Sequence, residues 1–211
     1  YSTDMGVDTI RRYASMFGLN RPSGIEISET TPELTTEDPE RSAMGQGTNS
    51  YSNVQLSRYV AAIANSGTVF DLSLLDKMTD SEGNLIQDFT PEATGHVDIA
   101  DSTWDAVHQG MRAVITDGSV NKIFKDLEVE IAGKTGTAQE SRTRGNHAFF
   151  ISYGPYTNPE ICVTVNIPYG YSSSNAAMVA KNVYRFYYGY TDLDSILGNG
   201  ALEVSNVRVG D

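Results

Sequence analysis

The sequence has very little cysteine and no long hydrophobic run, and each shortage excludes a class of protein. Its 211 residues include one cysteine, Cys162, so no disulfide can form within the chain. No window is apolar over the roughly 20 residues that a membrane-spanning helix needs, and no signal peptide opens the sequence. The first residue is Tyr1 rather than Met, so we expect a processed or partial chain.

Basic charge is also scarce. The chain has 15 Lys and Arg against 27 Asp and Glu, a formal net charge of -12. Nucleic acids and anionic membrane surfaces attract basic patches, so we expect neither as a partner, and solubility explains the acidity most simply. The three histidines and Cys162 do not cluster at metal-ligand spacing, so we predict no metal site and no cofactor.

In the first half of the chain, helical spacing and turn residues predict several elements. Apolar spacing predicts a helix near 8–17, with Asp8 as N-cap and Gly18 just past its end. Ser52 and Gln55 have the pattern of a capping box, which predicts a helix from there to about Asn65. The other predictions are a brief strand at 25–27, a surface loop at 28–40, a hairpin turn at 81–84, and a helix capped by Ser102 that buries Trp104, Val107, Met111 and Val114.

In the second half of the chain, three strands are predicted between two helices. Strands are predicted at 128–139, 147–153 and 160–168, and the turn at 155–159 makes the last two an antiparallel pair. The fold class is therefore α/β, with antiparallel strands packed against helices in a domain over 1–190. A tail over 191–211 has no strong period. A short helix is predicted around Val120, Ile123 and Phe124. A later helix is predicted to bury Ala176, Val179, Ala180, Val183 and Tyr187. Four tyrosines in and after that helix are predicted to form an aromatic seam that covers the sheet, namely Tyr184, Tyr187, Tyr188 and Tyr190.

One run, from Ala132 to Gln139, contains several residues that could assist catalysis if the run forms a strand. The ammonium of Lys134 favours a deprotonated nucleophile beside it and can relay a proton. A hydroxyl at Thr135 can bind a substrate carboxylate, and Gly136 lets another backbone come close. The N–H that follows the glycine, at Thr137, can face a developing oxyanion. Three residues alone are equally compatible with a tight turn that carries a solvated lysine.

The context of this run is an ordered series of further segments. Residues 4–27 contain Asp4-Met5-Gly6-Val7-Asp8 and Ser23-Gly24-Ile25-Glu26-Ile27, residues 43–67 contain Ala43-Met44-Gly45-Gln46-Gly47, and residues 147–156 follow the Lys-Thr-Gly strand. Over nearly all of 4–188 this series resembles the class B penicillin-binding proteins, and among them the elongation, or rod-shape, enzymes. Lys-Thr-Gly itself is a known signature of penicillin-recognising enzymes.

The resemblance implies a fold, a reaction and roles for the run. The fold would be the C-terminal portion of the penicillin-binding and serine β-lactamase-like transpeptidase fold. The enzyme would be a serine-type peptidoglycan D,D-transpeptidase that cross-links stem peptides by acyl transfer and binds β-lactams. Lys134 and Thr137 would be catalytic, and Thr135, Gly136 and Thr137 would bind substrate. The full-length protein would be anchored in the bacterial cell membrane by an N-terminal segment and face outward, with this fragment itself soluble.

Such enzymes also need two further motifs, Ser-x-x-Lys and Ser-x-Asn. Neither occurs in this chain at the place that the family's order of motifs requires. Ser119-Val120-Asn121-Lys122 fits Ser-x-x-Lys literally but lies just before Lys134, so we interpret Ser119 as part of a turn. Ser173-Ser174-Asn175 fits Ser-x-Asn but follows the run, so we interpret these serines as helix caps. We therefore expect a chain that lacks the nucleophile and is inactive alone. Its sheet would be incomplete, and the exposed edge of the 160–168 strand would pair with the missing N-terminal half or with a second copy.

Two alternatives to the transpeptidase remain open. One is a non-catalytic sensor that binds penicillin or peptidoglycan, and the other is a related D,D-carboxypeptidase or β-lactamase. The Gly-Gln-Gly loop and the long helix after it argue against the β-lactamase. His147 opens the strand beside the motif, where it either supports the site or only completes a hydrogen bond.

Overall fold

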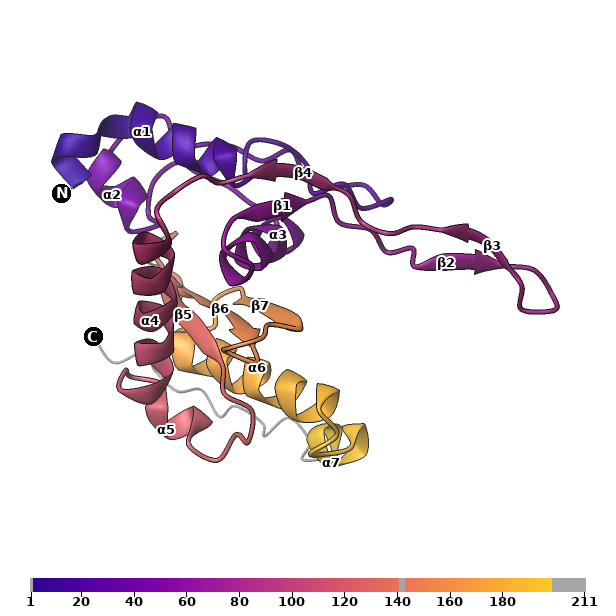
Figure 1. Cartoon of the computed structure of the whole chain (residues 1–211). Coiled ribbons are helices and arrows are strands. Elements are labelled where there is room, and N and C mark those ends of the chain that lie inside the picture. The colour runs from indigo at the N-terminus through magenta and orange to yellow at the C-terminus, as the bar shows by residue number, and fades with distance from the viewer. Residues whose placement is uncertain (1, 141–142, 199–211) are drawn as a thin grey trace. The chain divides into compact units, whose positions relative to one another are not determined.

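The computed structural model describes residues 2–140 and 143–198, which form two compact units, one within 1–110 and one within 111–211. The boundary falls inside helix α4, which is labelled in Figure 1. The first unit contains α1 (Ser2–Met16), α2 (Pro39–Ala43), α3 (Asn53–Ala64), β1 (Thr68–Phe70), β2 (Lys77–Thr79), β3 (Leu85–Asp88), β4 (Ala93–His96) and the start of α4 (Asp101–Thr116). The second contains the end of α4, α5 (Asn121–Phe124), β5 (Ala132–Ala138), β6 (His147–Gly154), β7 (Ile161–Ile167), α6 (Ser173–Tyr187) and α7 (Leu193–Leu197).

Helix α3 and the end of α1 lie where the sequence indicates. The capping box of α3 is confirmed, because the Ser52 hydroxyl accepts from the Gln55 N–H and the Gln55 side chain accepts from the Ser52 N–H. Gly18 has a φ of 78° just past α1, as a helix-ending glycine should. Helix α1 is longer than predicted and is kinked at Gly6, so Asp8 lies inside it instead of capping it.

The interior of the first unit contains a buried cation, Arg58. Its side chain is 0% exposed and donates to the backbone carbonyls of Gly18, Arg21 and Pro22. Asp71 lies 3.4 Å from one guanidinium nitrogen. Burial lowers the pKa of Arg58, and the nearby Arg21 acts in the same direction, whereas Asp71 opposes both. This side chain therefore fixes the loop after α1 against α3 through hydrogen bonds to backbone carbonyls.

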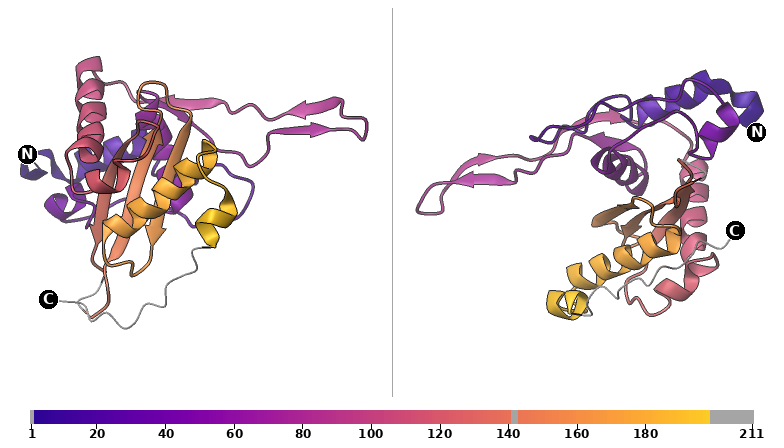
Figure 2. Two further views of the ribbon diagram at one scale, coloured as in Figure 1. Left: turned by 90° about the horizontal axis from the view of Figure 1, so that it is seen from below. Right: turned by 180° about the vertical axis from the view of Figure 1, so that it is seen from behind.

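Two small antiparallel ladders complete the first unit. β1 pairs with β4, and β2 pairs with β3 to form a hairpin that extends away from the β1–β4 ladder (Figure 2). The predicted turn at 81–84 is confirmed, with Asp80 accepting from the N–H groups of Glu82 and Asn84. These hydrogen bonds, and one from the Asn84 side chain, hold the pKa of Asp80 below its usual value. Every residue of β2 and β3 is exposed.

Several predictions for the first unit are wrong. Residues 25–27 form no strand, because the segment is held by the Glu26 carboxylate, which accepts from the Ser73 hydroxyl and the Leu74 N–H. The short helix α2 was not predicted and begins inside the expected loop. Helix α4 starts at Asp101, so Ser102 lies within it and is not its cap. Trp104 and Met111 are buried as predicted, whereas Val107 is exposed.

The second unit is built on a three-stranded antiparallel sheet in the order β5-β6-β7. In β5 and β6 the paired residues run from Ala132 with Tyr153 to Ala138 with His147. β6 and β7 pair from Ala148 with Ile167 to Gly154 with Ile161, and the connection at 155–159 is confirmed. Helix α6 lies across one face of this sheet (Figures 1 and 2).

The core of the second unit lies between that face and α6. Phe150 and Val163 from the sheet pack there with Ala176, Ala180 and Tyr184 of the helix. The Tyr184 hydroxyl donates to Ser152 Oγ at 2.9 Å, and Ser152 in turn donates to the Val163 carbonyl at 3.3 Å. Burial raises the pKa of Tyr184, as expected for a phenol away from water.

The predicted apolar face of α6 is displaced from the observed one. Ala176 and Ala180 are buried as expected, but the face continues to Tyr184, while Val179, Val183 and Tyr187 are exposed. The aromatic seam is wrong in the same way, because Tyr184 is fully buried while Tyr187 and Tyr190 are exposed. The cap of this helix is Ser172, whose hydroxyl accepts from the Ser174 N–H, and not Ser173 or Ser174.

Strand β5 begins at Ala132 and not at residue 128. The backbone before it has other partners, because Arg112 donates to the Ile131 carbonyl at 2.8 Å and the Tyr156 N–H donates to the Glu130 carbonyl at 2.8 Å. Arg112 also forms an ion pair with Glu130 at 2.7 Å. The alternation of polar and apolar residues at 128–131 therefore reflects this anchoring and not a longer strand.

The predicted tail contains one short helix, α7, and the rest of it, residues 199–211, lies outside the described residues. In the part of the chain that the structure covers, no helix has both the length and the apolar character needed to cross a bilayer.

Candidate active site

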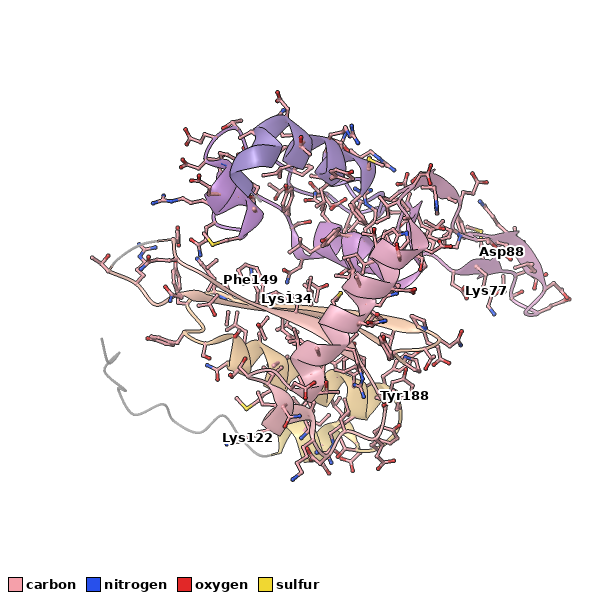
Figure 3. All side chains as sticks on the ribbon, turned by 60° about the vertical axis from the view of Figure 1, so that its left-hand side comes forward. Lys77, Asp88, Lys122, Lys134, Phe149 and Tyr188 are labelled. Atoms are coloured by element: carbon pink, nitrogen blue, oxygen red, sulfur yellow. The ribbon has the colours of Figure 1, made fainter. Side chains whose placement is uncertain are left out.

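The Lys-Thr-Gly run forms β5, at an edge of the three-stranded sheet. Over 2–140 and 143–198, β5 pairs with β6 alone, so its other side faces no strand. Residues paired across an antiparallel ladder share a face. Lys134 and Gly136 therefore share one face with Ile151 and Phe149, while Thr135 and Thr137 share the other with the buried residues Phe150 and Ala148. Figure 3 labels Lys134 and Phe149 on this strand pair.

The Lys134 side chain is exposed, and its ammonium donates to the carbonyl of the next residue, Thr135, at 2.7 Å. Because of this contact, the Lys134 side chain runs along its own strand. Thr137 is exposed and Thr135 is half-buried. Strand β5 thus carries one cation on one face and two hydroxyl side chains on the other, all within four consecutive residues, and each of these groups can bind a carboxylate.

The two glycines of the strand have different neighbours. A Cβ at Gly133 would lie 2.8 Å from both the Ile151 carbonyl oxygen and the Phe150 ring, closer than any real side chain approaches. A Cβ at Gly136 would lie 3.2 Å from the Phe149 Cβ, a tight contact but a less severe one. Gly133 is therefore required by the packing of β5 on β6, whereas the sequence directed attention only to Gly136.

A polar cluster lies at the end of β5 that follows the motif. His147 Nε2 is 3.1 Å from Glu140 Oε2, and the Tyr169 hydroxyl donates to the same oxygen at 3.3 Å. Arg144 donates to the Tyr169 hydroxyl at 2.8 Å. The hydrogen bond from His147 holds the pKa of Glu140 below its usual value, and Tyr169 and Arg144 act in the same direction. We call these four residues the Glu140 cluster.

Of these four residues, the sequence had singled out only His147. Of the two roles left open for His147, the structure shows the hydrogen bond, with Glu140 as the partner. Glu140 and Tyr169 are 29 positions apart, and no spacing rule connects them. Their contact exists because β6 and β7 bring the two connecting segments to the same end of the sheet.

The two literal serine motifs are not part of this strand edge. Ser119 lies exposed in the turn between α4 and α5, as expected. Ser173 and Ser174 belong to the first turn of α6. Within the described ranges, no group of three or more His, Cys, Asp or Glu side chains is arranged to hold a metal ion.

Comparison with known proteins identifies the family. Residues 1–185 match the model of the penicillin binding protein transpeptidase domain, so the chain belongs to that family. It is 28% identical to the peptidoglycan D,D-transpeptidase MrdA of Haemophilus influenzae over 87% of this chain and 33% of that protein. It is 30% identical to penicillin-binding protein 2A of Bacillus subtilis over 80% of this chain and 26% of that protein.

Among solved structures, penicillin-binding protein 2B of Streptococcus pneumoniae superposes with a TM-score of 0.77 at 26% identity, covering 89% of this chain and 33% of that one. The mixed α/β architecture, with antiparallel strands and packed helices, is thus the transpeptidase fold that the sequence predicted. The chain spans about a third or less of the length of these relatives.

Proposed function

We propose that the chain is the C-terminal portion of the transpeptidase domain of a peptidoglycan D,D-transpeptidase of the elongation type. The observation that carries the proposal is the Lys134–Thr137 run on the edge strand β5, in a chain that matches the transpeptidase family over 1–185. The relative from H. influenzae is itself named as a peptidoglycan D,D-transpeptidase.

In the proposed reaction, a serine outside this chain attacks the carbonyl carbon of a D-Ala–D-Ala bond. The hydroxyl proton passes to a base, and the tetrahedral intermediate expels D-Ala as the nitrogen takes up a proton. An amine of a second stem peptide then attacks the acyl ester, and the serine oxygen regains its proton. A β-lactam would form the same ester, and its opened ring would stay attached.

Strand β5 would contribute charge and orientation to this reaction. The Lys134 ammonium lowers the cost of the serine alkoxide and supports proton transfer. The hydroxyls of Thr135 and Thr137 donate to the substrate carboxylate, and the Thr137 N–H serves as one donor to the oxyanion. Gly136 lets the peptide backbone lie along the strand edge as an added strand. For the substrate to engage it, Lys134 would exchange its contact with the Thr135 carbonyl.

The chain alone is expected to be inactive, because it has no Ser-x-x-Lys motif in the family's order. The test is covalent labelling with a fluorescent penicillin. We expect no label on this chain, label on the full-length protein, and a large loss of label in full-length Lys134→Ala. Lys122→Ala, which removes an exposed lysine of α5, is the matched control. Ser119-dependent labelling of the chain alone, or wild-type labelling of Lys134→Ala, contradicts the proposal.

The same proposal covers the ligands, the membrane anchor and the strand pairing of the full-length protein. Stem peptides and β-lactams would be its ligands, and a membrane anchor upstream of this segment would hold it on the outer face of the cell membrane. The outer edge of β7 would pair with an upstream strand or, in the isolated chain, with a second copy. Light scattering of the isolated chain tests the last point, since a stable monomer would argue against pairing through that edge.

A further inference from the structure

Three separate segments meet at one carboxylate oxygen beyond the motif strand. Glu140 lies two residues past the end of β5, and its Oε2 is contacted by His147, the first residue of β6, and by Tyr169, from the connection between β7 and α6. A carboxylate only accepts hydrogen bonds, so His147 Nε2 carries the proton in this contact. Hydrogen bonds therefore connect the three segments at the point where β5 leaves the sheet, next to its last paired residue, Ala138.

The Tyr169 side chain is held from more than one direction. Its hydroxyl accepts from Arg144 while donating to Glu140, and the Arg144 guanidinium carbon lies 5.5 Å from the centre of its ring. The His147 and Tyr169 ring centres are 5.0 Å apart. An exposed ion pair contributes little by itself, but a ring contact and several hydrogen bonds that share atoms restrict the geometry far more than one pair does.

The backbone that carries Tyr169 adopts a conformation that needs support. Tyr169 and Tyr171 have φ angles of 55° and 62°, which non-glycine residues rarely adopt. The Tyr171 N–H donates to the Asn146 carbonyl at 2.9 Å, and the Asn175 side chain donates to the Gly170 carbonyl at 2.8 Å. Such a backbone persists when its surroundings determine it, which suggests that the position of the Tyr169 hydroxyl matters.

We propose that the Glu140 cluster positions the end of β5, and that Glu140 and Tyr169 are positioning residues for the Lys134–Thr137 edge. This inference rests on the proposed function. Glu140 follows Thr137 by three residues, so release of the carboxylate frees the strand end directly beside the proposed carboxylate-binding hydroxyl and oxyanion donor. A misplacement of about 1 Å can slow a reaction roughly a hundredfold, and we expect a smaller, about tenfold, effect here because β6 still pairs with β5.

The test compares variants of the full-length protein in two measurements. The first is the rate of acylation by fluorescent penicillin. The second is hydrogen–deuterium exchange of the peptide 132–139, which contains β5. Glu140→Ala should slow acylation about tenfold and raise exchange in that peptide, while peptides from β7 and α6 keep their wild-type exchange. Tyr169→Phe, which keeps the ring and removes the hydroxyl, should act in the same direction but less strongly.

Two further variants separate positioning from general stability. Glu140→Gln keeps an amide oxygen as acceptor and should recover most of the acylation rate lost in Glu140→Ala. Glu128→Ala removes an exposed carboxylate before β5 and should behave as wild type in both measurements. Wild-type acylation and exchange in Glu140→Ala would overturn the proposal, and so would an exchange increase spread evenly over all three strands.

A failure of the proposed function gives a different pattern. If the wild-type full-length protein takes up no label, the assignment as a transpeptidase fails, while the exchange of 132–139 in Glu140→Ala still decides whether the cluster holds the strand. If the wild type labels and Lys134→Ala does not, the transpeptidase proposal stands, and the cluster is judged by Glu140→Ala and its Gln counterpart alone.

Discussion

A large, fully buried side chain of the first unit is Arg58, whereas the interior of the second unit is an apolar cluster that includes Phe150, Val163, Tyr184 and the alanines of α6. The first interior combines buried apolar side chains such as Val60, Val69 and Trp104 with a cation that donates to backbone carbonyls, whereas the second combines apolar packing with one short chain of hydroxyl hydrogen bonds. A buried cation is costly unless its donors are satisfied, so the first unit tolerates little change around Arg58. The second unit depends on shape, which more substitutions can approximate.

Replacement of Arg58 should produce the largest loss of stability. Arg58→Met keeps much of the volume but leaves the carbonyls of Gly18, Arg21 and Pro22 without their donor. We expect a loss of about 3–5 kcal/mol in the free energy of unfolding, measured by urea denaturation. Arg41→Met, at an exposed arginine of α2, is the control and should stay near wild type. A loss below about 1 kcal/mol would mean that backbone packing, and not the cation, holds this loop.

Removal of the buried hydroxyl in the second unit should have a smaller effect. Tyr184→Phe deletes the hydrogen bond to Ser152 and keeps the ring in the core, so we expect a loss of about 1 kcal/mol. Combining it with Ser152→Ala should cost less than the sum of the two single changes, because the partners are lost together. Strict additivity in this double-mutant cycle would show that the 2.9 Å contact contributes nothing.

Changes on the β2–β3 hairpin should have the smallest effect. Leu85 and Ile86 are 60% and 62% exposed, so Leu85→Ser and Ile86→Thr remove no buried contact. We expect changes within about 0.5 kcal/mol in thermal unfolding. A larger destabilisation in either variant would mean that these side chains contact another surface of the folded protein.

The sequence predicted best those features that depend on neighbouring residues. The capping box of Ser52 and Gln55, the turn at 81–84 and the β6–β7 pair each rest on a local pattern. The face of α6 was only half predicted, because a 3.6-residue period fits Val183 and Tyr187 almost as well as Tyr184, and only the packing against the sheet decides between them.

Features that join distant segments were not predictable in this way. Arg58 contacts carbonyls 36 to 40 positions away, and a carbonyl carries no side-chain signature. The Lys-Thr-Gly run was recognised as a motif, but the start of its strand was not. Strand β5 starts at Ala132 because Arg112 donates a hydrogen bond to the carbonyl of the preceding residue, Ile131. The Glu140 cluster was missed for the same reason, since it forms only when two connecting segments meet at one end of the sheet.

Gly133 and Lys134 are neighbours in the chain, but the fold requires only the first of them. A single methyl group at this position would push β5 away from the Ile151 carbonyl and the Phe150 ring, so variation there is limited by whether the strands can assemble at all. Lys134, one residue later, is exposed and makes its hydrogen bond along its own strand, so the fold permits other side chains there. Inheritance of the lysine would therefore depend on selection for chemistry, and inheritance of the glycine on selection for a folded protein.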